Sequence, residues 1–355
     1  MESNKMMMAA VVHAQNDIRY EEFPEPVTQP GTVKLHIRAC GICGSDIPRV
    51  LGKGAHFYPI VLGHEFSGEV AEIGEGVEGL KVGDRVVCAS LIPCHKCADC
   101  ANGNFSLCKH YTFIGSRIQG GFADYVVVPA INVVKLADDS DFQEAALTEP
   151  ASVALHGVLQ AKFVGGKTVA VVGAGTIGIF TAQWAKLLGA KSVVYYDIDD
   201  DRLALAKDIT GDEGVNSRTE DAWEAAKRLT GGKGFDYVFG VSGAPASYKT
   251  CLAITANKAT VCFIGTPTGE ITFSIKEWET INRRELYVTG SWMSYTAPFP
   301  GPAWTMTVEY LNAGRLICDK RMVHKAFPMA QCKEAFACYE HPEQVKGRIL
   351  LVNED

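Results

Sequence analysis

Four cysteines lie close together between Cys94 and Cys108, with the spacing C-x2-C-x2-C-x7-C. Such short spacings let a single loop place four thiolates around a tetrahedral zinc ion. A 4Fe–4S cluster is the alternative, since C-x2-C-x2-C also opens the cysteine run of bacterial ferredoxins. Four sulfur ligands leave no position for a substrate, so we predict a structural zinc in a lobe over residues 91–110. Its ligands would be Cys94, Cys97, Cys100 and Cys108.

A second set of possible zinc ligands is spread along the chain. Cys43 follows an apolar run, His64 and Glu65 are adjacent, and Glu149 comes much later, before a proline. Thiolate, imidazole and carboxylate are good zinc ligands, and three of them with one open position make a catalytic site. Spacing alone does not show that these residues converge, and a buried, hydrogen-bonded histidine is the other interpretation of His64.

A glycine-rich segment predicts a dinucleotide site. The apolar run 169–172 leads into Gly173-Ala174-Gly175-Thr176-Ile177-Gly178, a G-x-G-x-x-G pattern that a helical pattern follows. The glycines allow a tight turn and a close approach to a pyrophosphate, which would sit at the helix N-terminus. Asp197, nineteen residues after Gly178, would accept hydrogen bonds from the ribose hydroxyls and repel a 2′-phosphate. We therefore predict NAD, although Arg202 could instead hold the 2′-phosphate of NADP.

The elements that must position these residues change character near residue 150. The first part has short apolar runs between Gly and Pro, typical of a barrel-like β region: Val33–Ala39, Glu69–Ile73, Asp84–Cys88 and Tyr125–Pro129. Strands and helices alternate over residues 168–290, as in a doubly wound parallel sheet. The strands predicted there are Thr168–Val172, Ser192–Tyr196, Phe235–Phe239, Ala259–Ile264 and Leu286–Thr289. Turns return after residue 298, followed by a helix and a last strand, Arg348–Val352.

Composition excludes several classes of protein. Hydrophobic residues make up 47% and charged residues 21% of the 355, as in an ordinary globular chain rather than a disordered one. Lys plus Arg number 34 against 41 Asp plus Glu, a net charge of −7 without a basic run, so no nucleic-acid partner is expected. Apolar runs fall short of the ~18 residues of a membrane helix, so we expect a cytoplasmic protein with no membrane partner, whose first strand includes Met6–Val12.

Longer motifs carry a family resemblance. Residues 63–77, GHEFSGEVAEIGEGV, fit the pattern GHE-x2-G-x5-G-x2-V without a gap, and CGSD at 43–46, the cysteine lobe and GAGTIG accompany it. By these motifs the whole chain resembles the zinc-containing medium-chain dehydrogenases. The resemblance implies an α/β fold, in which a GroES-like β-rich catalytic domain (1–155 and 297–355) carries an inserted Rossmann-type NAD-binding domain (156–296). It also implies a homodimer or homotetramer.

The resemblance gives the second set of ligands a role. Cys43, His64 and Glu149 would hold a catalytic zinc, so that each chain binds two zinc ions. Glu65 would lie beside that zinc, or act as a ligand that exchanges with water. The zinc would acidify a bound secondary alcohol, whose hydride passes to the nicotinamide of NAD.

Proton transfer and the nicotinamide cleft are also implied by the resemblance. Ser45 would accept the substrate proton, with a turn serine as the other interpretation. Family members carry a histidine five residues after the cysteine to pass the proton outward, and Pro48 stands there in this chain. Four residues at the ends of predicted strands would line the nicotinamide cleft; the other interpretation is that they form ordinary turns. Lys346 would contact the pyrophosphate. The cleft residues are Ser242, Gly265, Gly290 and Ser291.

Three segments resemble the galactitol-1-phosphate 5-dehydrogenase branch of this family: GSDIPRVLGKGAHFYPIVLGHEFSG, FIGSR and GSWMSYTAPFPGPAW. They imply the oxidation of galactitol 1-phosphate to tagatose 6-phosphate, with Arg49, Lys53 or Arg117 as phosphate contacts. Ile118 and Gln119 stand where that branch has a second basic residue, so a free hexitol or pentitol is the alternative substrate. A non-catalytic, zinc-stabilised binding protein is a remote alternative. The predicted substrate residues are Ser45, His56, Tyr58, Arg117 and Trp292.

Overall fold

The computed structural model describes residues 5–353, and its contacts divide the chain into two units. Unit 1 comprises the residues up to Glu149 together with those from Tyr295 onward. Unit 2 is the segment Pro150–Ser294 between them. The chain therefore leaves unit 1 and returns to it, with boundaries at residues 149/150 and 294/295, where the sequence predicted 155/156 and 296/297.

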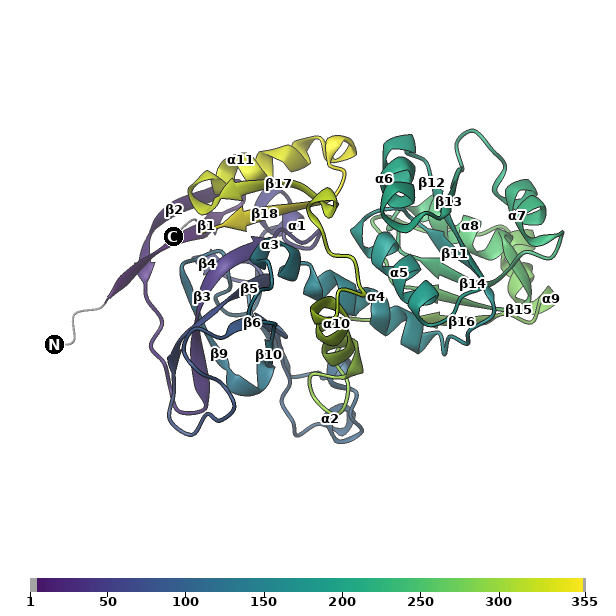
Figure 1. The fold of residues 1–355 in the computed structure, drawn as a ribbon. Helices are drawn as coiled ribbons and strands as arrows, with labels where there is room; N and C mark the ends of the chain where they lie inside the picture. Colours follow the sequence, from purple (N-terminus) through teal and green to yellow (C-terminus); the bar gives the residue numbers. More distant parts are fainter. Residues whose placement is uncertain (1–4, 354–355) are drawn as a thin grey trace. The chain divides into compact units, whose positions relative to one another are not determined.

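Unit 1 consists mainly of antiparallel β-sheet (Figure 1). The sheet orders are β2-β1-β4, β7-β8, and β10-β6-β5-β3-β18-β17, with β9 also paired to β3. The strands predicted from the first part of the chain correspond to β1, β3, β5, β6 and β9. The strand bounds are β1 Met6–Ala14, β2 Asp17–Pro24, β3 Thr32–Gly41, β4 Ile60–Val61, β5 Glu65–Ile73, β6 Arg85–Cys88, β7 Leu91–Ile92, β8 Thr112–Phe113, β9 Tyr125–Pro129, β10 Val133–Lys135, β17 Val323–Pro328 and β18 Arg348–Val352.

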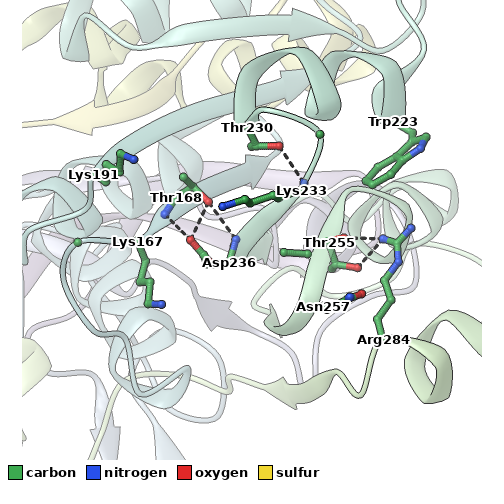
Figure 2. A pocket seen from close by; sticks show the side chains of 14 residues that line it. Lys167, Thr168, Lys191, Trp223, Thr230, Lys233, Asp236, Thr255, Asn257 and Arg284 are labelled. Carbon is green, nitrogen blue, oxygen red and sulfur yellow. Dashed lines mark hydrogen bonds between the residues drawn. The ribbon is translucent and has the colours of Figure 1, made fainter.

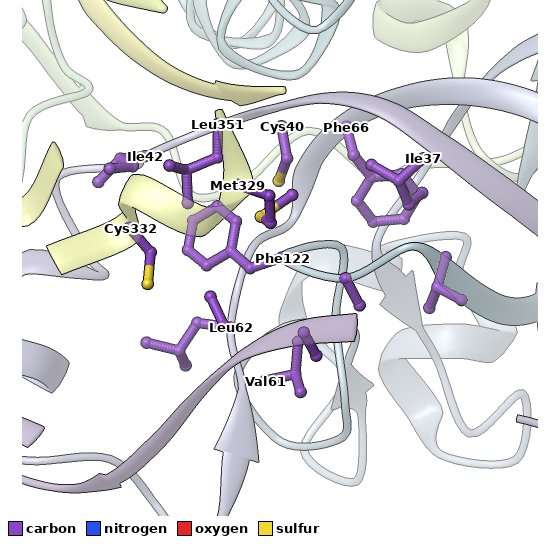
Figure 3. Close-up of a cluster of buried hydrophobic side chains, with 14 of the residues drawn as sticks. Ile37, Cys40, Ile42, Val61, Leu62, Phe66, Phe122, Met329, Cys332 and Leu351 are labelled. Carbon is purple, nitrogen blue, oxygen red and sulfur yellow. The ribbon is translucent and has the colours of Figure 1, made fainter. Parts of the chain in front are cut away.

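The core of unit 1 draws on both ends of the chain. β18 pairs antiparallel with β3, so that Leu351 lies opposite Cys40. Figure 3 shows Phe122 packed among residues of the C-terminal segment, including Met329 and Cys332. All of these side chains are buried, so their apolar surface is removed from water. This burial stabilises the last strand, β18, beside β3. The C-terminal segment thus completes the β-rich unit.

Short helices connect the strands of unit 1. Asp141 caps α3 by accepting hydrogen bonds from two backbone N–H groups of its first turn. Proline lies in the first turn of α1 and α10, where no intrahelical N–H is needed. The helix bounds are α1 Ile47–Leu51, α2 Ala98–Ala101, η1 Phe105–Leu107, η2 Ala130–Asn132, α3 Phe142–Ala145, α10 Pro302–Asn312, η3 Lys320–Met322, η4 Met329–Gln331, α11 Cys332–Ala337, η5 Cys338–Glu340 and η6 Pro342–Gln344.

Unit 2 contains a parallel six-stranded sheet in the order β13-β12-β11-β14-β15-β16. Five of its strands were predicted. The sixth, β13, was missed because the segment EGVN is short and half exposed, with no apolar run to mark it. The bounds are β11 Thr168–Val172, β12 Ser192–Asp197, β13 Glu213–Asn216, β14 Phe235–Gly240, β15 Thr255–Phe263 and β16 Tyr287–Gly290.

Helices cover both faces of this sheet, as in a doubly wound fold (Figure 1). Helices α5 and α6 pack together on one face, and α7, α8 and α9 lie on the other. The bounds are α4 Thr148–Gln160, α5 Thr176–Leu187, α6 Asp200–Thr210, α7 Ala222–Thr230, α8 Pro245–Ala253 and α9 Ile275–Arg283. Over residues 5–353, no helix combines the length and the apolar character needed to cross a membrane.

Candidate active site

The four lobe cysteines converge in unit 1. Cys94 and Cys97 precede helix α2, Cys100 lies within it, and Cys108 follows η1. The Sγ–Sγ distances are 4.0 Å from Cys94 to Cys100 and 3.9 Å from Cys97 to Cys108. Four sulfurs about 2.3 Å from one zinc would lie about 3.8 Å apart, whereas a disulfide requires about 2.05 Å. The lobe therefore fits one tetrahedral zinc, and its sulfurs are too close together to surround four irons.

Backbone donors support the thiolate form in this lobe. The N–H of Lys96 donates to Sγ of Cys94 at 3.5 Å and lowers the pKa of that thiol. Backbone N–H groups, first that of Cys100, lower the pKa of Cys97 to about 6. Burial acts oppositely on Cys100 and raises its pKa to about 12. A bound divalent cation would stabilise the thiolate there as well, which agrees with a zinc site.

The pairing register of β3 and β5 assembles the second group. Gly41 at the end of β3 lies opposite Glu65 at the start of β5, so Cys43 comes beside His64 and Glu65. Ligand atoms of Cys43, His64 and Glu65 lie within 4.8 Å of one another. A Cβ on Gly41 would lie 2.5 Å from Oε2 of Glu65, so a larger residue here would displace the Glu65 carboxylate. Sequence reasoning missed Gly41, which belongs to no motif.

Glu149, in the first turn of α4, is not among the residues whose ligand atoms lie within 4.8 Å, but its carboxyl interacts electrostatically with Glu65 and His64. Burial and the nearby charge of Glu65 raise the pKa of Glu149 to about 7. Burial, with the charges of Glu65 and Asp46, also holds the pKa of Cys43 well above its usual value. Buried anions that oppose one another in this way are stabilised by a divalent cation. The donor set of thiolate, imidazole and carboxylate is one that zinc prefers.

Two residues outside the predicted set support these ligands. Oδ1 of Asp46 lies 3.6 Å from Nδ1 of His64, and Nε of Arg348 lies 3.0 Å from Oε2 of Glu65. These contacts lack hydrogen-bond geometry, and Nδ1 of His64 and both oxygens of Glu65 make no other hydrogen bond. Such buried polar atoms with unused lone pairs suit metal coordination. Asp46 was visible in the CGSD motif, whereas Arg348 on the last strand carried no signal.

Ser45 lies next to the metal-ligand group and is held by a cation. Its backbone N–H lies 3.5 Å from Sγ of Cys43. Arg49, one helical turn later, donates from Nη1 to the Ser45 carbonyl at 2.6 Å and to Oγ at 2.9 Å. An arginine on Oγ stabilises negative charge there and eases proton release from the hydroxyl. Arg49, predicted as a phosphate contact, therefore also positions Ser45.

Two predicted phosphate contacts, Arg49 and Arg117, lie near the predicted substrate residue His56. Partial burial and the charges of Arg117 and Arg49 lower the pKa of His56. Arg117 stacks over the ring of Tyr111, with its guanidinium carbon 4.5 Å from the centroid. The Tyr58 hydroxyl accepts the N–H of Ala55 at 3.0 Å, so it also shapes this loop. Lys53 is exposed, and Trp292 belongs to unit 2 and is 51% exposed, which rules out a core position for it.

The glycine loop of unit 2 has the geometry that the motif predicts. Gly173 has a φ of +114°, and a Cβ on Gly178 would lie 1.9 Å from the Gly173 carbonyl oxygen. A Cβ on Gly175 would meet no atom within 4 Å, which leaves room for a phosphate at the start of α5. Oδ2 of Asp197 accepts the N–H of Ala174 at 2.7 Å. The carboxylate expected to bind ribose is thus fixed to the loop expected to bind pyrophosphate.

The remaining predicted cofactor residues divide between the units. Ser242 and Gly265 follow β14 and β15, Gly290 ends β16 and Ser291 follows it, all at the same carboxyl edge of the sheet as the glycine loop. Oγ of Ser291 is buried without a hydrogen bond. Arg202 lies in the first turn of α6. Lys346 belongs to unit 1, so its contact with a dinucleotide stays a prediction.

Comparison with known proteins agrees with this geometry. Residues 29–138 match the "Alcohol dehydrogenase GroES-like domain" and residues 176–309 match the "Zinc-binding dehydrogenase" family. Galactitol 1-phosphate 5-dehydrogenase of Escherichia coli (strain K12) is 38% identical over 322 residues, 90% of this chain and 92% of that protein. Sorbitol dehydrogenase of Bacillus subtilis (strain 168) is 30% identical over 352 residues, 98% of this chain and 96% of that protein.

Solved structures give the same result. The crystal structure of galactitol-1-phosphate dehydrogenase from Escherichia coli superposes with a TM-score of 0.92 at 34% identity, covering 98% of this chain and all of that one. The chain belongs to the zinc-binding dehydrogenase family. The predicted fold and class, a zinc- and NAD-dependent medium-chain dehydrogenase, are confirmed.

Proposed function

We propose that this enzyme oxidises the secondary alcohol of a phosphorylated hexitol, galactitol 1-phosphate to tagatose 6-phosphate, and transfers the hydride to NAD. The observation that carries the proposal is the placement of two arginines, Arg49 and Arg117, near the imidazole of His56, whose pKa their charges lower. Arg49 also contacts Ser45 directly, beside the thiol of Cys43. A phosphate dianion prefers arginine donors, which a neutral polyol does not require. The chain's net charge of −7 gives no long-range attraction, so recognition has to be local.

The metal-binding residues would act as two separate sites. Cys43, His64 and Glu149 would hold a catalytic zinc, with Glu65 beside it as a supporting or exchanging ligand, and the four lobe cysteines a structural one. When bound, the catalytic zinc supplies Lewis acidity toward the substrate hydroxyl. Ser45 would receive the proton of that hydroxyl and pass its own hydroxyl proton to water or to a ribose hydroxyl, because its Oγ is placed by Arg49 and its backbone N–H lies beside Sγ of Cys43. Asp46 places a carboxylate 3.6 Å from Nδ1 of His64.

Asp197 would select NAD over NADP. Its Oδ1 accepts N–H groups of Ile198 at 2.7 Å and Asp199 at 3.1 Å, and its Oδ2 accepts that of Ala174. These bonds fix the position of the carboxylate, so a ribose diol can bind it and a 2′-phosphate is repelled. Asp200 and Asp201 add negative charge in the first turn of α6, against the single positive charge of Arg202.

A free hexitol or pentitol is the second candidate substrate, and one observation favours it. Gln119, which stands in place of a second basic residue, is committed to the fold. Its Oε1 accepts the N–H of Val61 at 2.6 Å, and its Nε2 donates to the carbonyl of Pro59 at 3.4 Å. The phosphate would therefore depend on Arg117 and Arg49 alone.

The test is kcat/KM for galactitol 1-phosphate against galactitol and sorbitol, in wild type and Arg117→Ala. We expect wild type to prefer the phosphate ester, and Arg117→Ala to lose preference by about 10- to 100-fold while its kcat/KM for sorbitol stays unchanged. Arg19→Ala is the matched control, because Arg19 is exposed and paired with Asp17 on β2. Preference for the free polyol, untouched by Arg117→Ala, would remove the phosphate assignment.

We further propose a homo-oligomer that works in the cytoplasm. β16 forms an edge of the sheet of unit 2 and exposes Tyr287 and Val288, 68% and 44% accessible. Exposed apolar edge strands are open to pairing with another copy. All twelve cysteines are free thiols, a state that reducing compartments maintain. Size-exclusion chromatography with light scattering, in wild type and Val288→Lys, tests the interface.

A further inference from the structure

A cavity of about 740 Å³ lies at the amino edge of the sheet in unit 2. It is formed where β11, β14 and β15 begin, together with the end of α7 and the residues before β16. The glycine loop follows the carboxyl end of β11, five residues away, which corresponds to roughly 15 Å of strand. The cavity is therefore separate from the predicted dinucleotide site of this unit, and its size is that of a small-molecule pocket.

The lining of this cavity is strongly positive. Lys167, Lys191, Lys233 and Arg284 face one acid, Asp236. Within residues 5–353 the three lysines form no ion pair, whereas some other lysines of this unit do, for example Lys249 with Glu277. Four cations against one acid give the lining a charge of about +3, although the whole chain has a net charge of −7. The like charges repel one another.

The single acid is already occupied. Oδ2 of Asp236 accepts both the N–H and the Oγ1 of Thr168 at 2.9 Å, which ties the start of β14 to that of β11. Figure 2 shows Lys233 extending toward this pair of residues from one side, with Lys167 and Lys191 on the other side and the ammonium group of Lys167 turned away from the pair. Asp236 therefore serves as part of the scaffold that spaces the lysines, and it does not neutralise them through direct ion pairs.

The other end of the cavity offers a rigid, partly apolar surface. Nη1 of Arg284 donates to the Thr255 carbonyl at 2.6 Å and to its Oγ1 at 2.9 Å. The guanidinium also stacks on Trp223, 4.7 Å from the ring centroid, as seen in Figure 2. Arg284 is thus fixed before any ligand arrives, and Trp223 with Asn257 can contact the body of a polar organic molecule.

We propose that this cavity binds a phosphorylated small molecule, with the phosphate held by Lys167, Lys191 and Lys233 and the remainder against Arg284 and Trp223. Phosphate oxygens accept several charge-assisted hydrogen bonds at once, and each of the three lysines that line the cavity carries an ammonium donor. The site is distinct from the proposed substrate contacts, which lie on residues of unit 1 and on Trp292. It does not depend on which polyol the enzyme oxidises.

The experiment uses the zinc-loaded enzyme saturated with NADH and sorbitol, so that the dinucleotide site and the proposed substrate site are both filled. A hexose bisphosphate is titrated by calorimetry and by the fluorescence of Trp223, with Trp223→Phe identifying that signal. Inorganic phosphate is the competitor and free hexose the uncharged comparison. We expect one bisphosphate per chain, competition by inorganic phosphate, no binding of hexose, and weakening by tenfold or more in Lys167→Gln/Lys233→Gln.

Two further variants make the result decisive. Lys207→Gln/Lys249→Gln removes the same charge elsewhere on unit 2, and Arg117→Ala removes the proposed phosphate contact of unit 1. Both should bind the bisphosphate as wild type does. The proposal is overturned if wild type does not bind, if free hexose binds equally, if phosphate does not compete, or if either control variant weakens binding as much as the double lysine variant.

Discussion

Nε of Arg348 lies 3.0 Å from Oε2 of Glu65, and the two side chains are 12% and 1% exposed. They come from β18 and β5, which flank β3 on either side. Gly41 is the β3 residue between them, opposite Glu65 on one side and Leu350 on the other. Because Gly41 has no side chain, the arginine reaches across β3 to the glutamate. The last strand of the chain thereby holds a carboxylate of the candidate zinc site.

Arg348→Met should destabilise unit 1 by about 3–5 kcal/mol, because it leaves Glu65 buried without its cation. In the double variant Glu65→Gln/Arg348→Met the loss should be smaller than the sum of the two single losses, since the charge and its partner leave together. Urea unfolding of the zinc-loaded enzyme measures both. An Arg348→Met variant as stable as wild type would show that the ion pair contributes nothing.

Ser45→Ala should lower kcat by about 10²- to 10⁴-fold with zinc and NAD still bound, because the proton acceptor is removed. Arg49→Met should lower kcat less, since Ser45 remains but its Oγ loses the 2.9 Å donor. Stopped-flow NADH absorbance, with metal content determined on the same samples, checks both. A Ser45→Ala enzyme with unchanged kcat would mean that water takes the proton directly.

Asp197→Ala should weaken NAD and relax the exclusion of NADP, changing the ratio of the two kcat/KM values on the order of 10- to 100-fold. Asp197→Asn separates the causes, because it removes the charge while an amide oxygen can still accept the N–H of Ala174. Steady-state kinetics with both cofactors provide the ratio. Wild type that uses NADP as well as NAD contradicts the selection role of Asp197.

The sequence predicted most of the fold, because the apolar runs that mark strands are local. It predicted every parallel strand of unit 2 except β13, which has little apolar surface to signal it. It also named the ligand types of both metal groups, since those residues occur in dense motifs. It could not predict Gly41 or Arg348, because their roles depend on the pairing of β3 with both β5 and β18, strands far apart in sequence. The cavity at the amino edge could not be predicted for the same reason, because the ends of three strands that are far apart in sequence form it together.

His156 should make unit 2 sensitive to acid. Burial lowers the pKa of His156 to about 4, against about 6.5 in an unfolded chain. Between these values the unfolded state takes up a proton that the folded state does not, so stability falls as the pH drops from 6.5 to 4, by about 3 kcal/mol. His156→Gln should remove this part of the pH dependence, as measured by urea unfolding at pH 7 and pH 4.5. If the difference in unfolding free energy between wild type and His156→Gln is the same at pH 7 and pH 4.5, the prediction is wrong.

The central claim is that one metal site is catalytic and the other is structural. Metal content measured alongside NADH production tests this claim most directly. We expect two zinc ions per chain, and slow chelation should remove one of them first, together with all activity, because that site keeps a position open to solvent. Cys97→Ser is the matched variant: it should lose the other zinc and the stability of the lobe around Cys94 and Cys108. Activity that survives with only the lobe zinc bound, or that disappears while both ions remain, would contradict the account.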